Sequence, residues 1–268
     1  ADALAGDGHA VLIGHDLGLL RWGVTNSRER AGCEHEWLVV NWVDPARQGA
    51  AVAIRAWCET EGVRYASYLG EPQPVDPAQR TRWFLRWLYK GWNEMYAQAK
   101  TKWVARMGSD QFFGQDWLKW LFAPIGHFGE RAVYDTWTVE SPLAQHSRHP
   151  VMDFGTTLET FDRVQFDQYA DHLRHKHSSR YLLKPSETRL YYRHPARGLQ
   201  LRTDGVTWLQ TKALWEEFGP LPDTINAEGA SGDVAYRDVL FDAGVPAYLV
   251  APSVSFHLVR GESRDVQA

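Results

Sequence analysis

The chain has 268 residues, a formal net charge of −4 and 44% hydrophobic residues. This composition is typical of a soluble globular protein, and the small net charge excludes a strong general attraction to nucleic acid or membranes. Two cysteines are too few for a disulfide framework or a four-cysteine zinc site, so a reduced, cytoplasmic setting is expected. No run of 18 apolar residues predicts a membrane span, and the first ten residues lack the features of a signal peptide.

The first half of the chain alternates short apolar runs with segments of helical periodicity. Buried strands are predicted at residues 10–13, 37–40, 63–68 and 102–107, and helices at 17–30, 47–60 and 80–100. Strands that alternate with helices favour a mostly parallel sheet with right-handed crossovers. Ligands bind at the carboxyl ends of such strands, and here those ends carry the polar residues of 14–16, 41–44 and 108–110.

The second half of the chain is less regular. Residues 126–203 are polar and aromatic with weak periodicity, whereas 205–219 and 232–243 have helical patterns and 247–251 predicts a final strand. Because no Pro/Gly/Ser-rich linker divides the chain, residues 1–268 are predicted to form one domain with an insertion at 126–204.

Three side chains far apart in the sequence are candidates for chemistry. Asp110 follows an apolar strand, where a divalent cation could stabilise its buried carboxylate, or where it could simply cap the next turn. Asp233 opens a helix, either as an N-cap or as a base that takes a proton from a hydroxyl. His257 follows a strand and a Pro turn, either as a metal ligand or as a structural histidine.

The order of these features resembles the inverting family-two glycosyltransferases of GT-A fold. In that family a helix carries an Ala-Arg-Asn-x-Gly motif, whose Asn is matched by Asn93, and a metal-binding Asp-x-Asp motif follows a strand, where this chain has Gly108-Ser109-Asp110. Gly232-Asp233-Val234 looks like the family's Glu-Asp-Val motif, and Pro252-Ser253-Val254-Ser255-Phe256-His257 looks like its Pro-x-x-x-x-His motif. The chain departs from the family in having glycine at 108 and 232 in place of carboxylates.

The resemblance implies an α/β, Rossmann-like GT-A fold, with a mixed, mostly parallel sheet flanked by helices. Residues 10–125 would then bind the nucleotide sugar, 126–204 would face the acceptor, and 205–268 would carry the catalytic base and the metal-binding histidine. The implied donor is a nucleoside diphosphate sugar, most often a UDP sugar. Asn41 and Asp44 would contact its base and ribose, and Asn93, Ser109 and Asp110 would also belong to the donor site.

The implied metal ligands are Asp110 and His257, which with two diphosphate oxygens would hold Mn²⁺ or Mg²⁺. A mixed nitrogen and oxygen ligand set favours Mn²⁺ over Mg²⁺. Asp233 would act as the catalytic base for inversion at the anomeric carbon.

The acceptor is indicated only by a basic segment. Residues 172–202 contain eight Lys or Arg, from Arg174 to Arg202, and one acid. The segment therefore has a net charge of +7, and the rest of the chain has a net charge of −11. The segment could be a solvated loop face, or it could bind a polyanion such as a hydroxymethylated DNA base of the kind that some phage enzymes modify, in which case the setting would be the host cytoplasm.

Two rival functions remain open at the level of sequence. A nucleotidyltransferase would need a Gly-rich phosphate loop after the first strand, and residues 14–18 contain only two glycines. A non-catalytic nucleotide-sugar or nucleic-acid binding module with the same fold would fit the carboxylates that are missing at Gly108 and Gly232.

Overall fold

The structure is a computed structural model that describes residues 8–12, 17–43, 48–72, 74–143, 149–178, 181–182, 191–194, 198–201, 207–222 and 232–258. Its strands are β1 (Gly8–Leu12), β2 (His35–Val43), β3 (Arg64–Leu69), β4 (Trp103–Arg106), β5 (Gln111–Phe113), β6 (Val133–Glu140), β7 (Tyr191–His194), β8 (Gly198–Leu201), β9 (Trp208–Thr211) and β10 (Ala247–His257). Its helices are α1 (Leu17–Glu29), α2 (Gln48–Thr60), α3 (Pro77–Gln98), α4 (Trp117–Phe122), α5 (Ile125–Phe128), α6 (Arg163–His177), α7 (Lys212–Phe218) and α8 (Gly232–Asp242).

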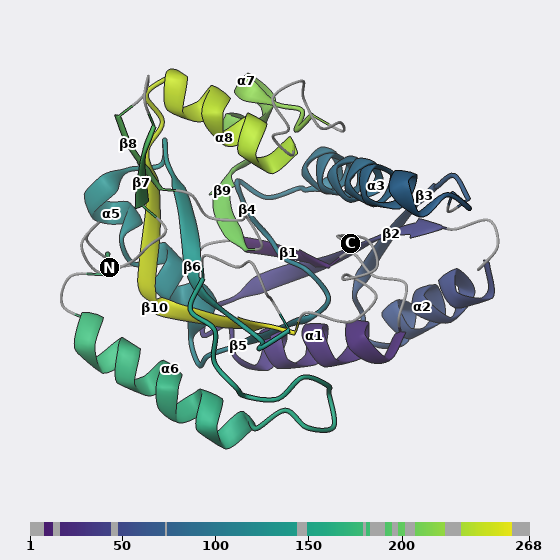
Figure 1. The fold of residues 1–268 in the computed structure, drawn as a ribbon, viewed down its shortest axis with the longest axis horizontal. Helices are drawn as coiled ribbons and strands as arrows, with labels where there is room; N and C mark the ends of the chain where they lie inside the picture. Colours follow the sequence, from purple (N-terminus) through teal and green to yellow (C-terminus); the bar gives the residue numbers. More distant parts are fainter. Residues whose placement is uncertain are drawn as a thin grey trace.

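Eight of the strands form one twisted sheet in the order β3-β2-β1-β4-β9-β6-β10-β5 (Figure 1). β1 to β4 run parallel, as do β6 and β10, whereas β9 and the edge strand β5 are antiparallel to their neighbours. The predicted α/β architecture, a mixed and mostly parallel sheet flanked by helices, is therefore confirmed.

Helices cover both faces of this sheet, which explains why its strands are apolar on both sides. α1 and α2 lie on one face, and α3, α7 and α8 lie on the other (Figure 1). In β2, Trp37 and Val39 belong to the hydrophobic core beneath α1 and α2, whereas Leu38 and Val40 belong to the core beneath α3. A strand buried on both faces reads as a continuous apolar run, and that is the pattern that predicted it.

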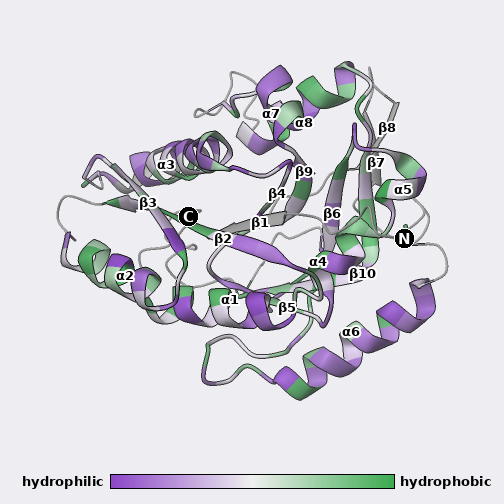
Figure 2. Ribbon diagram, turned by 180° about the vertical axis from the view of Figure 1, so that it is seen from behind, coloured by the Kyte–Doolittle hydropathy of each residue, from purple (hydrophilic) through white to green (hydrophobic). Residues whose placement is uncertain are grey.

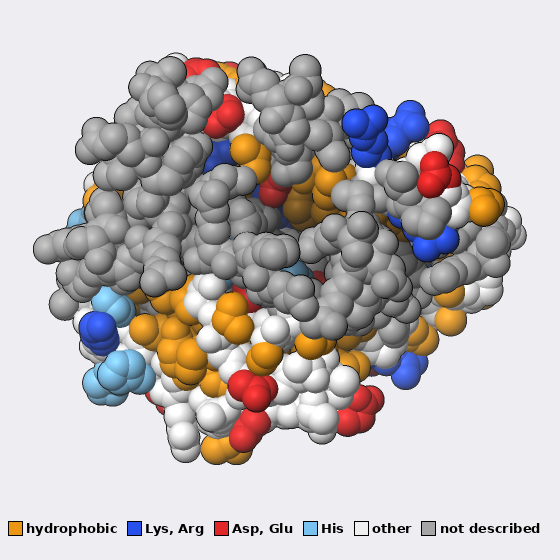
Figure 3. Space-filling model, in the orientation of Figure 1, with side chains coloured by type: hydrophobic (Ala, Val, Ile, Leu, Met, Phe, Trp, Pro, Cys, Tyr) orange, Lys and Arg blue, Asp and Glu red, His pale blue; other side chains and the backbone are white. Residues whose placement is uncertain are grey.

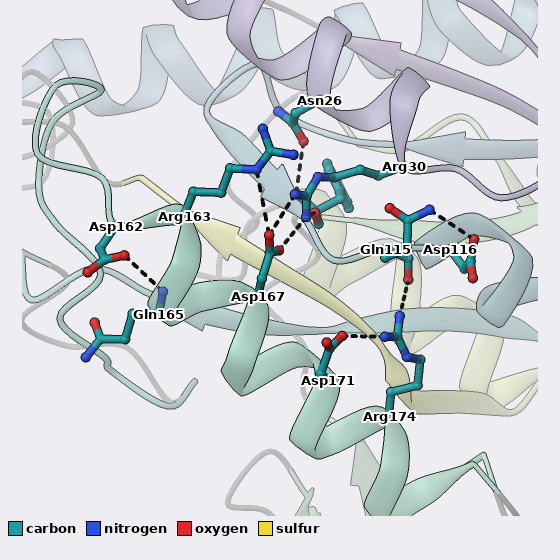
Figure 4. A network of polar contacts seen from close by, with 11 residues as sticks. Asn26, Arg30, Gln115, Asp116, Asp162, Arg163, Gln165, Asp167, Asp171 and Arg174 are labelled. Carbon is teal, nitrogen blue, oxygen red and sulfur yellow. Dashed lines mark hydrogen bonds and ion pairs between the residues drawn. The ribbon is translucent and has the colours of Figure 1, made fainter.

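α6 packs against β10 through a narrow stripe of side chains. Figure 2 shows this helix as mostly hydrophilic, and its buried residues are Phe166, Ala170, Leu173 and His177, which recur every three or four positions. Figure 4 shows a polar contact in the N-terminal half of α6, where the Arg30 guanidinium donates to both carboxylate oxygens of Asp167 at 2.5 and 2.9 Å. Arg30 also donates to the carbonyl of Phe113 at 3.1 Å, so α1, β5 and α6 are tied together.

Most elements of the first half, together with α8, lie within three residues of their predicted bounds. The predicted helix at 205–219 is wrong in its first part, because Trp208–Thr211 forms β9 and only Lys212–Phe218 is helical. β9 is buried along its whole length between β4 and β6, and Thr211 caps the following helix by accepting a hydrogen bond from the Leu214 amide at 3.2 Å.

Two further differences concern the strands that carry the candidate site. The last strand does not end at 251 but continues to His257, with an irregularity in pairing between Val250 and Val254 that accommodates Pro252. Within the predicted insertion 126–204, Val133–Glu140 forms β6, which is buried throughout and lies near the centre of the sheet. Residues 133–140 are therefore part of the protein core. Their polar side chains interrupt the apolar run, so the sequence pattern did not predict this strand. None of the helices within the described ranges is long and apolar enough to cross a membrane.

Candidate functional site

The carboxyl ends of β6 and β10 bring two ionisable side chains together. These strands are parallel neighbours, and their last residues, Glu140 and His257, are paired in register. β5 runs antiparallel on the other side of β10 and pairs Gln111 with His257, so Asp110 lies just beyond that pair. The backbone amide of Leu258 donates to the Asp110 carbonyl at 2.8 Å and extends the pairing by one residue.

His257 lies between two carboxylates. Its Nε2 atom is 3.3 Å from Asp110 Oδ2, and its Nδ1 atom is 2.8 Å from Glu140 Oε2. The side chains of Asp110 and His257 are each 21% exposed, whereas that of Glu140 is 6% exposed. A ligand from solvent can therefore reach the Asp110 side of the imidazole, and Glu140 supports the ring from the protein interior.

The two carboxylates also set the charge of His257. Burial lowers its pKa, but the charges of Glu140 and Asp110 and the hydrogen bonds to them outweigh burial and hold the pKa well above 6.5. The two carboxylates therefore favour the protonated form of the ring, in which both nitrogens can donate.

The loop that carries Asp110 packs tightly against α1. Ser109 is 5% exposed, and a Cβ added at Gly23 of α1 would lie 2.5 Å from the Ser109 carbonyl oxygen. The Gly108 amide donates to Gln111 Oε1 at 2.9 Å, and Thr207 Oγ1 donates to the same oxygen at 2.6 Å. A Cβ at Gly108 would meet Asp110 Oδ1 at 2.7 Å, so the glycine leaves room for the carboxylate in this orientation.

Asp110 and His257 fit a divalent cation in donor chemistry and in spacing. Adjacent ligands of an octahedral ion with bonds of about 2.1 Å lie about 3 Å apart, which is close to the 3.3 Å between Nε2 and Oδ2. Among the described residues, no group of three or more His, Cys, Asp or Glu side chains is arranged to hold a metal ion. A cation at this pair would therefore take its remaining ligands from a bound substrate and water.

Asp233 lies at the start of α8 and is 7% exposed. Its Oδ1 atom accepts hydrogen bonds from Tyr89 Oη at 2.8 Å and from the Val234 amide at 2.9 Å. A Cβ at Gly232 would lie 2.0 Å from the Pro222 carbonyl oxygen, so the backbone of the neighbouring segment excludes a larger residue there.

Arg106, the last residue of β4, is a buried cation that interacts electrostatically with Asp233. Its guanidinium carbon lies 3.3 Å from the ring centroid of Trp208 and 3.9 Å from that of Trp92, and the side chain is fully buried. Burial lowers the pKa of Arg106 to about 10, while the nearby phenol of Tyr96 and the Asp233 carboxylate raise it. The charge of Asp233 is therefore felt by Arg106, the residue that ends β4.

The other predicted donor-site residues are placed differently. Asn41 lies inside β2, which runs on to Val43, and it is 2% exposed with its amide 3.4 Å from Tyr65 Oη. Asn93 exchanges two hydrogen bonds of 2.8 Å with the backbone of Leu221 and accepts a third from Trp215 Nε1 at 3.2 Å. Asn93 therefore holds the segment between α7 and α8. Asp44 lies outside the described residues.

The basic segment is described only in part. The last turn of α6 carries Arg174, His175, Lys176 and His177, and basic side chains gather at that end of the helix in Figure 3. Arg174 is engaged within the protein, because it pairs with Asp171 and donates to the Gln115 carbonyl at 3.1 Å (Figure 4).

Sequence reasoning missed Glu140 and Tyr89. Glu140 ends a strand that was not predicted, and Tyr89 lies in the middle of a predicted helix among many aromatic residues. The useful signal for Glu140 was its place as the last polar residue before Ser141-Pro142, where the strand stops.

No protein-family model and no curated protein sequence matches this chain. Among solved structures, the chain is similar to glucosyl-3-phosphoglycerate synthase from Mycobacterium tuberculosis, determined in complex with Mn²⁺, UDP and phosphoglyceric acid. The TM-score is 0.49 and the identity 13%, over 97% of this chain and 73% of that one. A likeness this remote carries no function with it, so the site has to be judged on its own geometry.

Proposed function

We propose that this protein is a metal-dependent, inverting glycosyltransferase that uses a nucleoside diphosphate sugar. The observation that carries the proposal is the contact between Asp110 and His257, which are 147 positions apart in the sequence and meet at the carboxyl edge of the sheet. Ligands of α/β proteins bind at that edge. The order of the motifs along the chain, which resembles family-two enzymes, supports the same proposal.

In this proposal Asp110 and His257 hold Mn²⁺ or Mg²⁺ together with two oxygens of the donor diphosphate. A bound cation would supply Lewis-acid stabilisation of the negative charge on the departing diphosphate. The chain itself orients the two ligands: the Leu258 amide fixes the Asp110 backbone, and Glu140 contacts the far side of the His257 ring.

Asp233 is the proposed base, which takes the proton from the acceptor hydroxyl as that hydroxyl attacks the anomeric carbon. The hydrogen bonds from Tyr89 and Val234 hold one of its oxygens in place. Such general-base assistance contributes about 10²–10⁴-fold to the rate. Ser109 and Asn41, which are almost fully buried, are proposed to shape the donor site from the interior of the protein. Asn93 is proposed to hold the segment between α7 and α8 against α3.

The acceptor is proposed to be an anionic molecule. The excess of basic residues in 172–202 supports an anionic acceptor, such as a phosphorylated glycan or a hydroxymethylated base in DNA.

A second candidate is a binding module of the same architecture that does not turn over its ligand. The observation that favours it is the burial of Asp233, a residue that is only 7% exposed, which limits the access of an acceptor to it. Turnover separates the two candidates, because a binding module retains Mn²⁺-dependent nucleotide binding and cleaves no donor.

The test is to incubate purified protein with a panel of nucleoside diphosphate sugars and to measure release of the nucleoside diphosphate. We expect release that EDTA abolishes and Mn²⁺ restores, and that Asp110→Asn lacks under all conditions. Glu59→Gln, at an exposed carboxylate of α2, serves as the matched control and should behave as wild type. Full activity in EDTA would exclude a catalytic role for the Asp110–His257 pair.

A further inference from the structure

Glu140 contacts His257 on the nitrogen opposite to Asp110, and its side chain is less exposed than that of Asp110. Its Oε2 atom is 2.8 Å from Nδ1, whereas Asp110 approaches Nε2. The glutamate is fixed by its strand, because its amide donates to the Pro150 carbonyl at 2.8 Å and its carbonyl accepts from the Met152 amide at 3.0 Å. The Ser141 amide donates to the His257 carbonyl at 3.2 Å, which locks the two strand ends together.

From this geometry we infer that Glu140 is the positioning residue that prepares His257 to bind the cation. This inference rests on the proposed function, since it concerns the same metal site. It names a residue that the sequence motifs do not contain.

The chemistry of imidazole explains why such a partner is required. A neutral ring has one nitrogen that carries a proton and one that carries a lone pair, and only the latter can bind a metal. A carboxylate accepts hydrogen bonds and cannot donate one, so Glu140 keeps the proton on Nδ1. The nitrogen that would give up its proton to a cation is then Nε2, which lies on the Asp110 side. The same contact fixes the rotation of the ring about its side-chain bonds.

Glu140 is not placed as a third ligand of a cation bound at Nε2 and Asp110, because it contacts the other nitrogen of the ring. Its side chain is 6% exposed and lies against the nitrogen opposite to the one that Asp110 approaches. Its effect on the cation therefore passes through the ring of His257.

Two substitutions of Glu140 probe this role. Glu140→Gln preserves the size of the side chain, but its amide can either accept from or donate to Nδ1, so it no longer imposes one tautomer. Glu140→Ala removes the partner altogether. Loss of such a partner typically weakens metal affinity about 10–100-fold, and we expect about 10-fold for Gln and a larger loss for Ala.

The experiment is a titration of Mn²⁺ followed by electron paramagnetic resonance, on the full chain at saturating UDP. Wild type, Glu140→Gln, Glu140→Ala and Asp110→Asn are compared, with Glu59→Gln as an exposed control that should match wild type. Thermal unfolding in EDTA verifies that each variant is folded. If Glu140→Ala does not fold, the Mn²⁺ affinity of Glu140→Gln alone tests the inference. A purely structural role for Glu140 would lower the unfolding midpoint and leave the dissociation constant of Mn²⁺ unchanged.

The outcomes separate the inference from the proposed function. If wild type binds Mn²⁺ more tightly than Asp110→Asn, and Glu140→Gln binds as tightly as wild type, the inference is overturned and the proposed metal site stands. If wild type and Asp110→Asn bind Mn²⁺ equally weakly, the metal site is absent and both are overturned.

Discussion

The Asp233 carboxylate is held by two donors on the same oxygen, one of them the phenol of Tyr89, which comes from α3. Tyr89 is 2% exposed, so its ring is packed inside the protein and orients the hydroxyl toward Asp233. A base that is fixed before the acceptor arrives loses little entropy during the reaction, which is how orientation contributes to catalysis.

The first prediction concerns this residue. We expect Asp233→Asn to bind UDP and Mn²⁺ as wild type does and to lose transfer by about 10²–10⁴-fold, because the amide cannot accept the proton. Tyr89→Phe, which retains the ring and removes the hydroxyl, should lose less than Asp233→Asn. Steady-state transfer rates and UDP titrations measure both effects, and turnover near the wild-type level in Asp233→Asn would remove this residue from the proposed role.

Two glycines illustrate what the sequence could and could not predict about single residues. The motif order placed Asp110 and His257 in one site, and the structure brings them to 3.3 Å. Gly108 and Gly232 looked like lost carboxylates, but a Cβ would meet Asp110 Oδ1 at 2.7 Å at the first position and the Pro222 carbonyl at 2.0 Å at the second. The first approach lies within one loop and the second joins the start of α8 to Pro222, so both depend on backbone geometry that the motif comparison does not encode.

At the scale of elements, α1 positions the Asp110 loop by close packing at Gly23. The helix can lie against the Ser109 backbone only because residue 23 has no side chain. The loop then has little freedom, because β5 and Leu258 hold its other end.

We therefore predict that Gly23→Ala destabilises the fold by about 1–3 kcal/mol, the usual cost of overpacking, and weakens Mn²⁺ binding by moving Asp110. The matched control is Gly49→Ala in α2, where no atom lies within 4 Å of the added Cβ and the better helix former should be neutral or stabilising by up to about 1 kcal/mol. Denaturant unfolding and Mn²⁺ titration measure the two effects. Equal behaviour of the two variants would contradict the packing argument.

Two strands that the sequence failed to predict, β6 and β9, are buried at every position and yet carry polar side chains. β6 is rich in β-branched and aromatic residues, but Asp135, Thr136, Thr138 and Glu140 interrupt the continuous apolar run by which the other buried strands were predicted. Asp135 is compensated by Arg237 of α8, whose guanidinium donates to it at 3.0 and 3.2 Å. β9 lies next to a helix in sequence, and its short run of four residues merged with the helical pattern.

At the scale of the whole molecule, the charge is unevenly distributed. Residues 172–202 carry +7 and the remainder −11, although Arg174 is already paired with Asp171. If this segment binds a nucleic-acid acceptor, counterion release makes the affinity fall with salt by about 0.9 logarithmic units per decade for each phosphate contact.

We expect transfer to a polyanionic acceptor to weaken steeply between low and physiological salt, while donor cleavage without acceptor changes little over the same series. The contrast isolates the acceptor surface from the donor site. A flat response of acceptor affinity to salt would exclude a DNA acceptor.

The sheet order is the whole-molecule feature on which the site depends. Asp110 leads into the edge strand β5 and His257 ends its neighbour β10, although the two residues come from opposite halves of the chain. Alternating strands and helices predicted the parallel half of this sheet, whereas the antiparallel insertion of β9 between β4 and β6 depends on tertiary pairing.

The most direct measurement is a crystal structure with Mn²⁺ and UDP, with diffraction data collected at the manganese absorption edge. The account predicts one anomalous peak within bonding distance of both Asp110 Oδ2 and His257 Nε2, with diphosphate oxygens completing its coordination. UDP bound without a cation at these two atoms, or manganese bound elsewhere in the protein, would contradict it.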